Sequence, residues 1–402
     1  MPEPQIIEVP VLITMPGTDS FEGFHRPDGQ IGTRNRLLVL SVTGLTGPSA
    51  RRISACLPGS LIVDYPYDSG PLGDDRESQD RALVGFAVNP NVGAVLIVSA
   101  NPPRADDLAG RILAGGKPIE VVVMDDCGHD AVTLTEHGIR LGARLTKEIS
   151  AQRRRQAPLS SLYLGLECGR SDPSSGLVAN PLMGLIADRL IDLGGTAVIG
   201  ESTEWLGAEH LLAERAVSED VGRQIIDAVT AREQATIDGG RDLTGNNPGP
   251  TNIAAGLSTI EEKSLGNIAK SGSRPIQSLI QWAERPDGPG MHLMDAPAYA
   301  PESLSGFAAS GCQLMIFSTG VGNSFVNSIS PTIKISANPE TCERLQKQLD
   351  FKCADVFVGK NPLDAAADDL MKVLVDIASG TLTWGEIHGE GAEAFSRMGA
   401  SL

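Results

Sequence analysis

From Arg36 onwards, short apolar runs of strand length alternate with longer segments of helical character. The first four runs read LLVLSV, LIVD, AVLIVS and IEVVVM, and helices are predicted after them at about residues 48–57, 75–88, 104–113 and 130–152. A helix after each strand carries the chain back across the sheet, so that successive strands become parallel neighbours. The alternation therefore predicts an α/β fold.

A basic, proline-containing stretch, QRRRQAPLSS, interrupts the alternation near residue 157. A chain of 402 residues is long enough for more than one core. We therefore predict two doubly wound, mainly parallel-sheet domains: residues 1–157, beginning with a short tail, and residues 158–402, which carry most of the active site. In the tail, residues 1–22, prolines within an apolar pattern are typical of an edge strand. The arginine run is interpreted as the solvated end of a helix.

Charge and composition exclude several classes of partner. The formal net charge of −17 argues against nucleic acid and against anionic membranes. No apolar run approaches the roughly 20 residues of a membrane span, and the start MPEPQIIEVP lacks the features of a signal peptide. The six cysteines show no C-x-x-C spacing, which disfavours a zinc ribbon or a redox pair. We expect a cytoplasmic protein with reduced thiols.

Reactive side chains are densest after the predicted strand at residues 162–166. That strand is followed directly by ECGRSD, and the predicted strand at residues 195–199 by GESTEW, in which Ser202 or Thr203 is expected to cap a helix. Open α/β sheets bind ligands at the carboxyl ends of their strands. Two strand ends are therefore predicted to direct carboxylates, a thiol and a helix amino terminus into one crevice.

Scaffold roles account for some of these side chains equally well. Turns between strands and helices are rich in Ser and Asp because these residues make tight turns and cap helices, and this applies to Ser171 and Asp172. For Cys168 the alternative is a small buried residue. Glu201 and Glu204, which follow an apolar strand closely, are harder to explain as scaffold.

Long motifs elsewhere in the chain carry a family resemblance. Besides ECGRSDPSSGLVANP and GGTAVIGESTEWLGAEHLLAERA, they read GFHRPDGQIGTRN, NPNVGAVLIV, NNPGPTNIAAGLSTIEEKSLGNIAKSG, MDAPAYAPESLSG and PTIKISANP. Taken in their order along the chain, they resemble the large catalytic part of the altronate and galactarate dehydratase family, which also contains the large subunit of sulfolactate sulfo-lyase. The resemblance covers nearly the whole chain.

The resemblance implies a lyase that eliminates water from a 2-hydroxy acid or sugar acid and leaves a 2-keto acid. An alternative is a sulfo-lyase that eliminates sulfite from a sulfolactate-like acid, and an alternative of another class is a non-catalytic subunit that binds a small acid. Removing a proton beside a carboxylate requires stabilisation of the enediolate, commonly by a divalent cation. The resemblance implies such an ion, with Fe(II) favoured and Mn(II) or Mg(II) as alternatives.

Site residues are implied by the same motifs. The predicted metal ligands are Cys168, Asp172, Glu201 and His210, donors that suit iron, manganese or magnesium. The predicted catalytic residues are Glu204, Lys263 and Asp295, with Lys263 as base or as carboxylate clamp. The predicted substrate-binding residues are Arg34, Arg170, Ser171, Asn247, Thr319 and Asn323; the arginine guanidinium offers a planar fork of donors.

Other parts of the C-terminal half are interpreted by their patterns. The turn-rich stretch at residues 238–250 is predicted to be a functional loop, and APAYAPES a turn. In the helical run STIEEKSLGNIAK, Ile260, Leu265 and Ile268 are predicted to mark the apolar face, and Lys270 is interpreted as part of a solvated face, with base or clamp as its alternative. His292 is interpreted as a core histidine.

Departures from the family pattern bear on the substrate. Where the dehydratases carry His and Cys residues, this chain reads DYPYDSGPLGDD and VSANPPRAD, and the first of these resembles the sulfo-lyase. The motif CGRSD contains Arg170 where the family has a glycine. The motif TGVGN contains Val321 at the position where the family pattern leads us to expect a substrate-binding arginine. We therefore expect an acid of about three or four carbons rather than altronate or galactarate. The family's small domain is not recognised in the sequence, so a separate small subunit is expected, together with a homo-oligomer.

Overall fold

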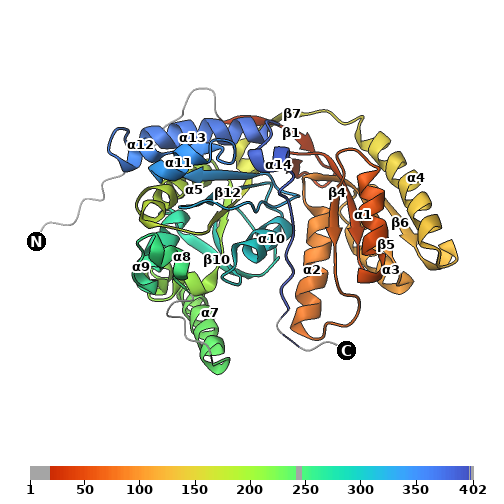
Figure 1. The fold of residues 1–402 in the computed structure, drawn as a ribbon, viewed down its shortest axis with the longest axis horizontal. Coiled ribbons are helices and arrows are strands. Elements are labelled where there is room, and N and C mark those ends of the chain that lie inside the picture. Colours follow the sequence, from red (N-terminus) through yellow and green to blue (C-terminus); the bar gives the residue numbers. More distant parts are fainter. Residues whose placement is uncertain (1–18, 241–246, 398, 400–402) are drawn as a thin grey trace, which may run out of the picture.

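The computed structural model describes residues 19–240, 247–397 and 399. Residues 1–18 of the predicted tail and residues 241–246 of the turn-rich stretch lie outside this description. The described residues form two parallel sheets and a small antiparallel sheet (Figure 1). Among them, no helix is both long and apolar enough to cross a membrane.

The first parallel sheet has the strand order β4-β3-β5-β6. Its strands and helices are β3 (Arg36–Ser41), α1 (Gly47–Ala55), β4 (Leu61–Asp64), α2 (Asp74–Val88), β5 (Val92–Ser99), α3 (Pro102–Leu113), β6 (Ile119–Val123) and α4 (Ala131–Ile149). Leu38 and Leu40 pack with α2 and α3, whereas Leu37 and Val39 pack with α1 and α4. Helices on both faces of a parallel sheet confirm the predicted doubly wound arrangement.

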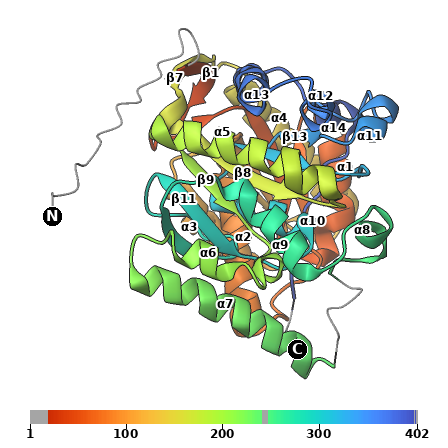
Figure 2. The ribbon, with the colours of Figure 1, turned by 90° about the vertical axis from the view of Figure 1, so that its left-hand side faces the viewer.

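The second parallel sheet has the order β10-β11-β9-β8-β12-β13-β14. Its strands are β8 (Tyr163–Cys168), β9 (Thr196–Ile199), β10 (Ile276–Gln281), β11 (Gly290–Asp295), β12 (Leu314–Ser318), β13 (Thr332–Ser336) and β14 (Phe351–Lys352). The helices are α5 (Asn180–Asp192), α6 (Glu209–Ala213), α7 (Glu219–Asp238), α8 (Pro250–Ala254), α9 (Ile260–Ile268), α10 (Ala300–Ser310), α11 (Pro339–Arg344), α12 (Ala354–Phe357), α13 (Leu363–Ala378) and α14 (Trp384–His388). Figure 2 shows α5 lying across this sheet.

The strand order places a topological switch point at the carboxyl edge of the second sheet. From β8 the chain passes to β9 on one side, whereas β12 pairs with β8 on the other side. The loops that follow β8 and β12 therefore lead away from each other. In open α/β sheets this topological switch point is where ligands bind.

The two parallel sheets share a core across α2 and α10. Phe86 of α2 and Phe307 of α10 belong to one buried cluster, together with side chains from both sheets. The contact is close, since a Cβ on Gly85 would lie 2.1 Å from the carbonyl oxygen of Ala309. The helix α10 was not predicted, because APAYAPES was interpreted as a turn. Pro301 in fact stands in the first turn of α10, where a missing N–H costs no hydrogen bond.

The small antiparallel sheet joins β1 (Ser20–His25), β2 (Ile31–Gly32) and β7 (Arg155–Pro158). The predicted boundary after residue 157 falls within β7 and stays a prediction. The interpretation of the arginine run as a solvated helix end is confirmed for Arg153, which is exposed and donates to the carbonyl of Ser150 at the end of α4, but it was wrong for Arg154. The helix α4 ends at Ile149, and the guanidinium of Arg154 donates to the carbonyls of Thr33 and Ala378. The Arg154 side chain therefore links two segments that are distant in sequence, one at Thr33 and one at the end of α13.

Residues 390–397 run from the end of α14 to α2, where the carbonyl of Ser396 accepts a hydrogen bond from Gln79 (Figure 1). Phe395 packs edge-to-face against Tyr65 and Phe86, with ring centroids 5.2 and 5.8 Å apart. The carboxyl group of Glu393 accepts hydrogen bonds from the hydroxyl and the backbone N–H of Ser328. Burial raises the pKa of Glu393 from 4.5 to about 7.

We predict that Glu393→Gln changes how stability depends on pH. Since the folded-state pKa is raised, the native protein binds a proton more tightly than the unfolded chain, and the carboxyl group lowers stability as pH rises from about 4.5 to about 7. The glutamine keeps an acceptor for Ser328 and does not titrate. Relative to the natural chain, the variant should gain up to about 3 kcal/mol in free energy of unfolding across this window.

Urea denaturation at about pH 5 and about pH 8 measures this gain. The exposed Glu343, changed to Gln, is the matched control and should show no such trend. A stability difference for Glu393→Gln that is the same at both pH values would contradict the prediction.

Candidate active site

Buried charged side chains gather at the carboxyl ends of β8 and β9. Glu167 and Cys168 end β8, and Glu201 and Glu204 follow β9. The helix α9 and the turn after it contribute Lys263, Asn267 and Lys270. Glycines permit the approach of this helix, since a Cβ on Gly266 would lie 3.0 Å from the Cα of Gly176.

The pair of Glu167 and Lys270 forms the base of this cluster. Both side chains are fully buried, and the Lys270 ammonium donates to a carboxylate oxygen of Glu167. The backbone N–H of Cys168 lies 3.0 Å from the same oxygen, and the hydroxyl of Ser303 donates to the other. A buried carboxylate is tolerated only when paired and hydrogen-bonded, as it is here.

Lys270 also sets the electrostatics of the neighbouring thiol. Its ammonium lies 3.7 Å from the Cys168 sulfur, and the Asn267 amide lies 3.5 Å from it. Burial raises the pKa of Cys168, whereas Lys270 acts to lower it. Burial alone would lower the pKa of Lys270, but its interactions with the acidic groups of Cys168 and Glu167 outweigh this and raise it. Lys270 therefore stays charged at neutral pH.

A second ion pair, between Lys263 and Glu204, lies nearer the surface. Their side chains are 11% and 8% exposed. Lys263 donates to Glu204 and to the side-chain oxygen of Asn247, and Asn267 donates to the other Glu204 oxygen at 2.7 Å. Burial acts to lower the pKa of Lys263, but Glu204 outweighs it and raises the pKa. An ammonium group held protonated suits a carboxylate clamp better than a base.

Glu201 is the least satisfied acid of the cluster. It is 2% exposed and has a left-handed backbone conformation, with φ of 67°. Burial, reinforced by Glu167 and Glu204, raises its pKa well above the ordinary value.

Several buried polar atoms around this cluster lack partners within residues 19–240, 247–397 and 399. They are Glu201 Oε2, Ser171 Oγ, Asn247 Nδ2, Ser264 Oγ and Asn267 Oδ1. Buried polar atoms are nearly always hydrogen-bonded in native proteins, so a group of exceptions indicates a place for a ligand, an ion or water.

The donor set fits a divalent cation. Ligand atoms of Glu167, Cys168 and Glu201 lie within 4.8 Å of one another. Both oxygens of Glu167 already accept hydrogen bonds. The Cys168 sulfur is contacted by the Lys270 ammonium and the Asn267 amide, and the unpartnered donor atoms are those of Glu201 and the Asn267 oxygen. Carboxylate, amide and thiolate donors together suit iron or manganese.

Two of the predicted metal ligands lie outside this cluster. One carboxylate oxygen of Asp172 accepts hydrogen bonds from Ser174 and Ser175, and the other accepts one from Asn338. These contacts hold the turn after β8. His210 is exposed on α6. The structure thus brings Cys168 and Glu201 together and leaves the other two apart.

Arg34 and Asp295 are engaged by protein partners. Every N–H group of the Arg34 guanidinium donates to the protein: Glu386 takes two at 2.7 and 2.8 Å, and backbone carbonyls take the rest. Asp295 accepts from Ser202 at 2.5 Å and from Arg232 at 3.0 Å. The expected helix cap at Ser202 or Thr203 was wrong, because a 3-10 turn, Ser202–Trp205, begins there without a side-chain cap.

The other predicted substrate-binding residues border the cluster and the loop after β12. Ser171 is buried in the turn after β8, and Asn247 contacts Lys263. Arg170 is exposed and donates to the carbonyl of Gly322 at 3.1 Å, while the buried Thr319 hydroxyl accepts from the N–H of the same glycine. Asn323 follows in this loop, and its side-chain nitrogen has no partner in the described part of the chain.

Sequence reasoning missed the inward polar face of α9. Leu265, predicted to be on the buried face, is 52% exposed, whereas Ser264 and Asn267 are buried. Lys270 is fully buried, so its interpretation as part of a solvated face was wrong. The spacing of Lys263, Asn267 and Lys270 by four and three residues is a helical stripe, and that polar periodicity was the available signal. His292 is a buried strand residue whose ring nitrogens lie near Ser278 and Gly288, as expected of a core histidine.

Comparison with known proteins finds matches over nearly the whole chain. Residues 159–401 match the family model of the D-galactarate/altronate dehydratase C-terminal part, and residues 23–150 match that of the D-galactarate dehydratase/altronate hydrolase second domain. The (2R)-sulfolactate sulfo-lyase subunit beta of Chromohalobacter salexigens is 34% identical, over 94% of this chain and 97% of that protein.

Two sugar-acid dehydratases are also similar. The altronate dehydratase of Bacillus subtilis is 30% identical over 95% of this chain and 78% of that protein. The galactarate dehydratase (L-threo-forming) of Escherichia coli is 27% identical over 90% of this chain and 73% of that protein. All three names denote lyases.

We predict that Lys270→Met strongly destabilises the protein, because it leaves the Glu167 carboxylate buried without a counter-charge. Breaking a buried ion pair in this way costs about 3–5 kcal/mol of the free energy of unfolding. The double variant Glu167→Gln with Lys270→Met buries neither charge and should recover much of this loss. Urea denaturation of the single and double variants measures both effects.

The exposed pair of Lys372 and Asp369, each side chain 60% exposed, supplies the control. Lys372→Met should change stability by no more than about 0.5 kcal/mol. If Lys270→Met proves as stable as this control, the ion pair does not hold the site together.

Proposed function

Because the chain belongs to the D-galactarate/altronate dehydratase family, as its motifs predicted, we propose that it is a lyase that eliminates the β substituent of a short 2-hydroxy acid and leaves a 2-keto acid. The observation that supports this most is the buried cluster at the carboxyl ends of β8 and β9. It combines an ammonium group near the surface, Lys263, with a carboxylate, Glu204, and with unpartnered donor atoms.

In the proposed reaction the substrate carboxylate binds Lys263. This ammonium group stays protonated, so it neutralises the charge that develops on the carboxylate when the adjacent proton leaves. Glu204, held in place by Lys263 and Asn267, lies beside that position and accepts the proton. Asp295, paired with Arg232 and Ser202, positions the turn that carries Glu201.

We further propose a divalent metal ion, with Fe(II) ahead of Mn(II) or Mg(II). Cys168 and Glu201, joined by the Asn267 oxygen, would hold it. Bound there, the ion would act as a Lewis acid on oxygen atoms of the substrate. Asp172 and His210 are not part of this proposed ligand set, because they lie apart from the cluster.

The leaving group is proposed to be hydroxide or sulfite. Arg170 is exposed beside the loop after β12, where it can receive an anionic group. Val321 in that loop provides no side-chain cation for a second substrate carboxylate, which favours an acid of about three or four carbons. The similarity to a sulfo-lyase subunit over nearly the full length of both chains supports the sulfite alternative.

A separate small subunit is proposed as partner. The chain spans 97% of the sulfo-lyase relative, which is named as a subunit, but 78% of the Bacillus subtilis altronate dehydratase. In the dehydratase, additional residues are therefore part of the same polypeptide. Homo-oligomer formation stays a prediction.

We expect sulfolactate or a short dihydroxy acid to be a better substrate than altronate or galactarate. The test measures kcat/KM for 2-keto acid formation with each acid, with and without added Fe(II). A buried arginine that pairs with an anionic substrate contributes about 2–5 kcal/mol. Because Val321 stands where the family pattern has such an arginine, kcat/KM for the short acids should exceed kcat/KM for altronate and galactarate by a factor of about thirty or more. A higher kcat/KM for altronate or galactarate would contradict the proposed substrate. No 2-keto acid from any of them would favour the non-catalytic alternative.

We expect Lys263→Met to lower kcat/KM about a hundredfold or more, because it removes a cation that acts on developing charge. Lys263→Arg keeps the charge and should recover part of the activity. Lys372→Met, at an exposed site, should leave kcat/KM unchanged. Bound metal should be retained in all three variants. A kcat/KM for Lys263→Met equal to that of the natural chain would rule out Lys263 as the group that binds the substrate carboxylate.

A further inference from the structure

Two exposed arginines lie against the loop after β12, at the switch point of the second sheet. Arg170, in the turn after β8, donates to the carbonyl of Gly322 at 3.1 Å. Arg344, at the end of α11, donates to the carbonyl of Val321 at 3.2 Å. Because these carbonyls belong to adjacent residues, the two guanidinium groups reach the same part of the loop from different elements.

Contacts among the turn, the loop and α11 fix the backbone around both arginines. The Asn338 amide at the start of α11 donates to Asp172 in the turn at 2.7 Å. The Thr341 hydroxyl donates to the carbonyl of Gly320 in the loop, also at 2.7 Å. The turn and the loop touch as well, since a Cβ on Gly320 would lie 2.6 Å from the Asp172 carboxyl group. The three segments are therefore packed as one unit.

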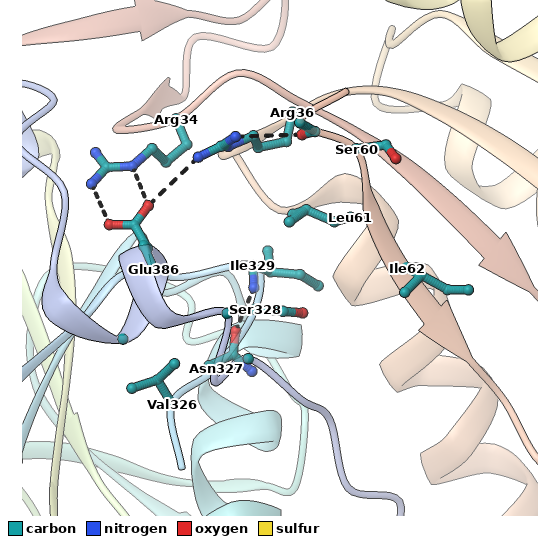
Figure 3. A pocket seen from close by; sticks show the side chains of 14 residues that line it. Arg34, Arg36, Ser60, Leu61, Ile62, Val326, Asn327, Ser328, Ile329 and Glu386 are labelled. Atoms are coloured by element: carbon teal, nitrogen blue, oxygen red, sulfur yellow. Dashed lines mark hydrogen bonds and ion pairs between the residues drawn. The ribbon is translucent and has the colours of Figure 1, made fainter. Parts of the chain in front are cut away.

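Neither arginine is neutralised by an acidic side chain. Within residues 19–240, 247–397 and 399, each forms one hydrogen bond and no ion pair. Glu340 and Glu343 lie on the same helix as Arg344, but they are exposed and do not pair with it. Arg34 shows the opposite state, because Glu386 takes two of its N–H groups at 2.7 and 2.8 Å (Figure 3). The two exposed arginines thus keep most of their N–H donors free for an anion.

The other charged groups in contact with this unit leave a positive excess. Lys334 donates to the carbonyl of Asn323 in the loop, and the carboxylate of Glu390 neutralises it at 2.6 Å. Asp172 is buried, and its oxygens accept from neutral donors. Among the described residues that contact the loop, two unpaired guanidinium charges therefore stand against one carboxylate.

The backbone at Arg170 supports a role for its side chain. Its φ is 54°, in the left-handed region that a residue with a Cβ adopts at a steric cost and that glycine adopts freely. Strain of this kind is concentrated at functional sites. Arg170 follows Cys168 by two residues, so its side chain begins beside the proposed active site.

Given the proposed elimination reaction, on which this step rests, we propose that Arg344 and Arg170 together bind a sulfonate group on the β carbon of the substrate. A sulfonate presents three oxygen atoms in a tetrahedral array, so it accepts from two guanidinium groups that approach from different elements. The neutral hydroxyl of a dihydroxy acid gains little from either charge. The pair therefore selects sulfite over hydroxide as the leaving group.

The charge on this group grows during the reaction. The α proton moves to Glu204, the C–S bond breaks, and its electron pair leaves with sulfur as sulfite. The group thus changes from a sulfonate with one negative charge to a sulfite with two. Two guanidinium groups stabilise that increase, so they bind the transition state more tightly than the substrate.

Titration calorimetry of the full chain with 3-sulfopropanoate tests the proposal, because this acid lacks the 2-hydroxyl group and cannot give a 2-keto acid. It should bind saturably to one site per chain, and 3-hydroxypropanoate, which has no second charge, at least tenfold more weakly. Arg344→Gln and Arg170→Gln keep a donor for the loop carbonyl but lose the charge. Each should weaken 3-sulfopropanoate at least tenfold, or about 1.4 kcal/mol, and leave 3-hydroxypropanoate unchanged.

Three further variants separate this site from other effects of charge. Arg153→Gln changes an exposed arginine that also donates to backbone carbonyls, and Lys347→Gln removes an exposed cation three residues after Arg344. Both should bind 3-sulfopropanoate like the natural chain. Lys263→Gln removes the proposed carboxylate clamp and should weaken both acids.

The proposal is overturned if 3-sulfopropanoate does not saturate, if 3-hydroxypropanoate binds as tightly, or if Arg344→Gln binds both acids like the natural chain. It is also overturned if Lys347→Gln weakens 3-sulfopropanoate as much as Arg344→Gln, or if Lys263→Gln leaves its binding unchanged. Turnover tests the proposed function separately. If no acid gives a 2-keto acid, that function is contradicted, whereas these binding results still decide the role of the two arginines.

Discussion

The buried ion pair between Glu167 and Lys270 is the interaction on which the geometry of the candidate site depends. It joins the end of β8 to the turn after α9, which are 103 residues apart in the sequence. Separating the two segments would leave an unpaired buried charge, which is so unfavourable that the ion pair fixes their relative position. Asn267 and Lys263 precede Lys270 by three and seven residues, so the same contact places them against Cys168 and Glu204.

The regular part of the fold could be predicted from the sequence because its signal is local. Runs such as LLVLSV and AVLIVS are apolar except for one serine each, as strands covered on both faces tend to be, and β3 and β5 appear where these runs stand. The segments that were missed depend on contacts distant in sequence. β7 exists because it pairs with β1, and α10 is defined by its packing on α2 rather than by its proline-rich start.

The candidate site was predictable to the extent that strand ends determine it. The rule that ligands bind at carboxyl ends of parallel strands correctly located Cys168, Glu201 and Glu204 in one cluster. It gives no information on which charges are already paired. Arg34 resembles a free clamp in sequence, yet Glu386, 352 residues away, occupies it. The burial of Lys270 likewise depends on a carboxylate that no local pattern connects with it.

The core shared by α2 and α10 has a consequence for synthesis on the ribosome. The first sheet and its helices emerge as an almost complete unit, but the side of α2 at Gly85 and Phe86 is completed by α10 and by Phe395. After α4, the last helix of this unit, more than 150 further residues must be translated before α10 is complete. During that interval the apolar surface around Phe86 of α2 lacks its cover, and transiently exposed surface of this kind is what chaperones bind.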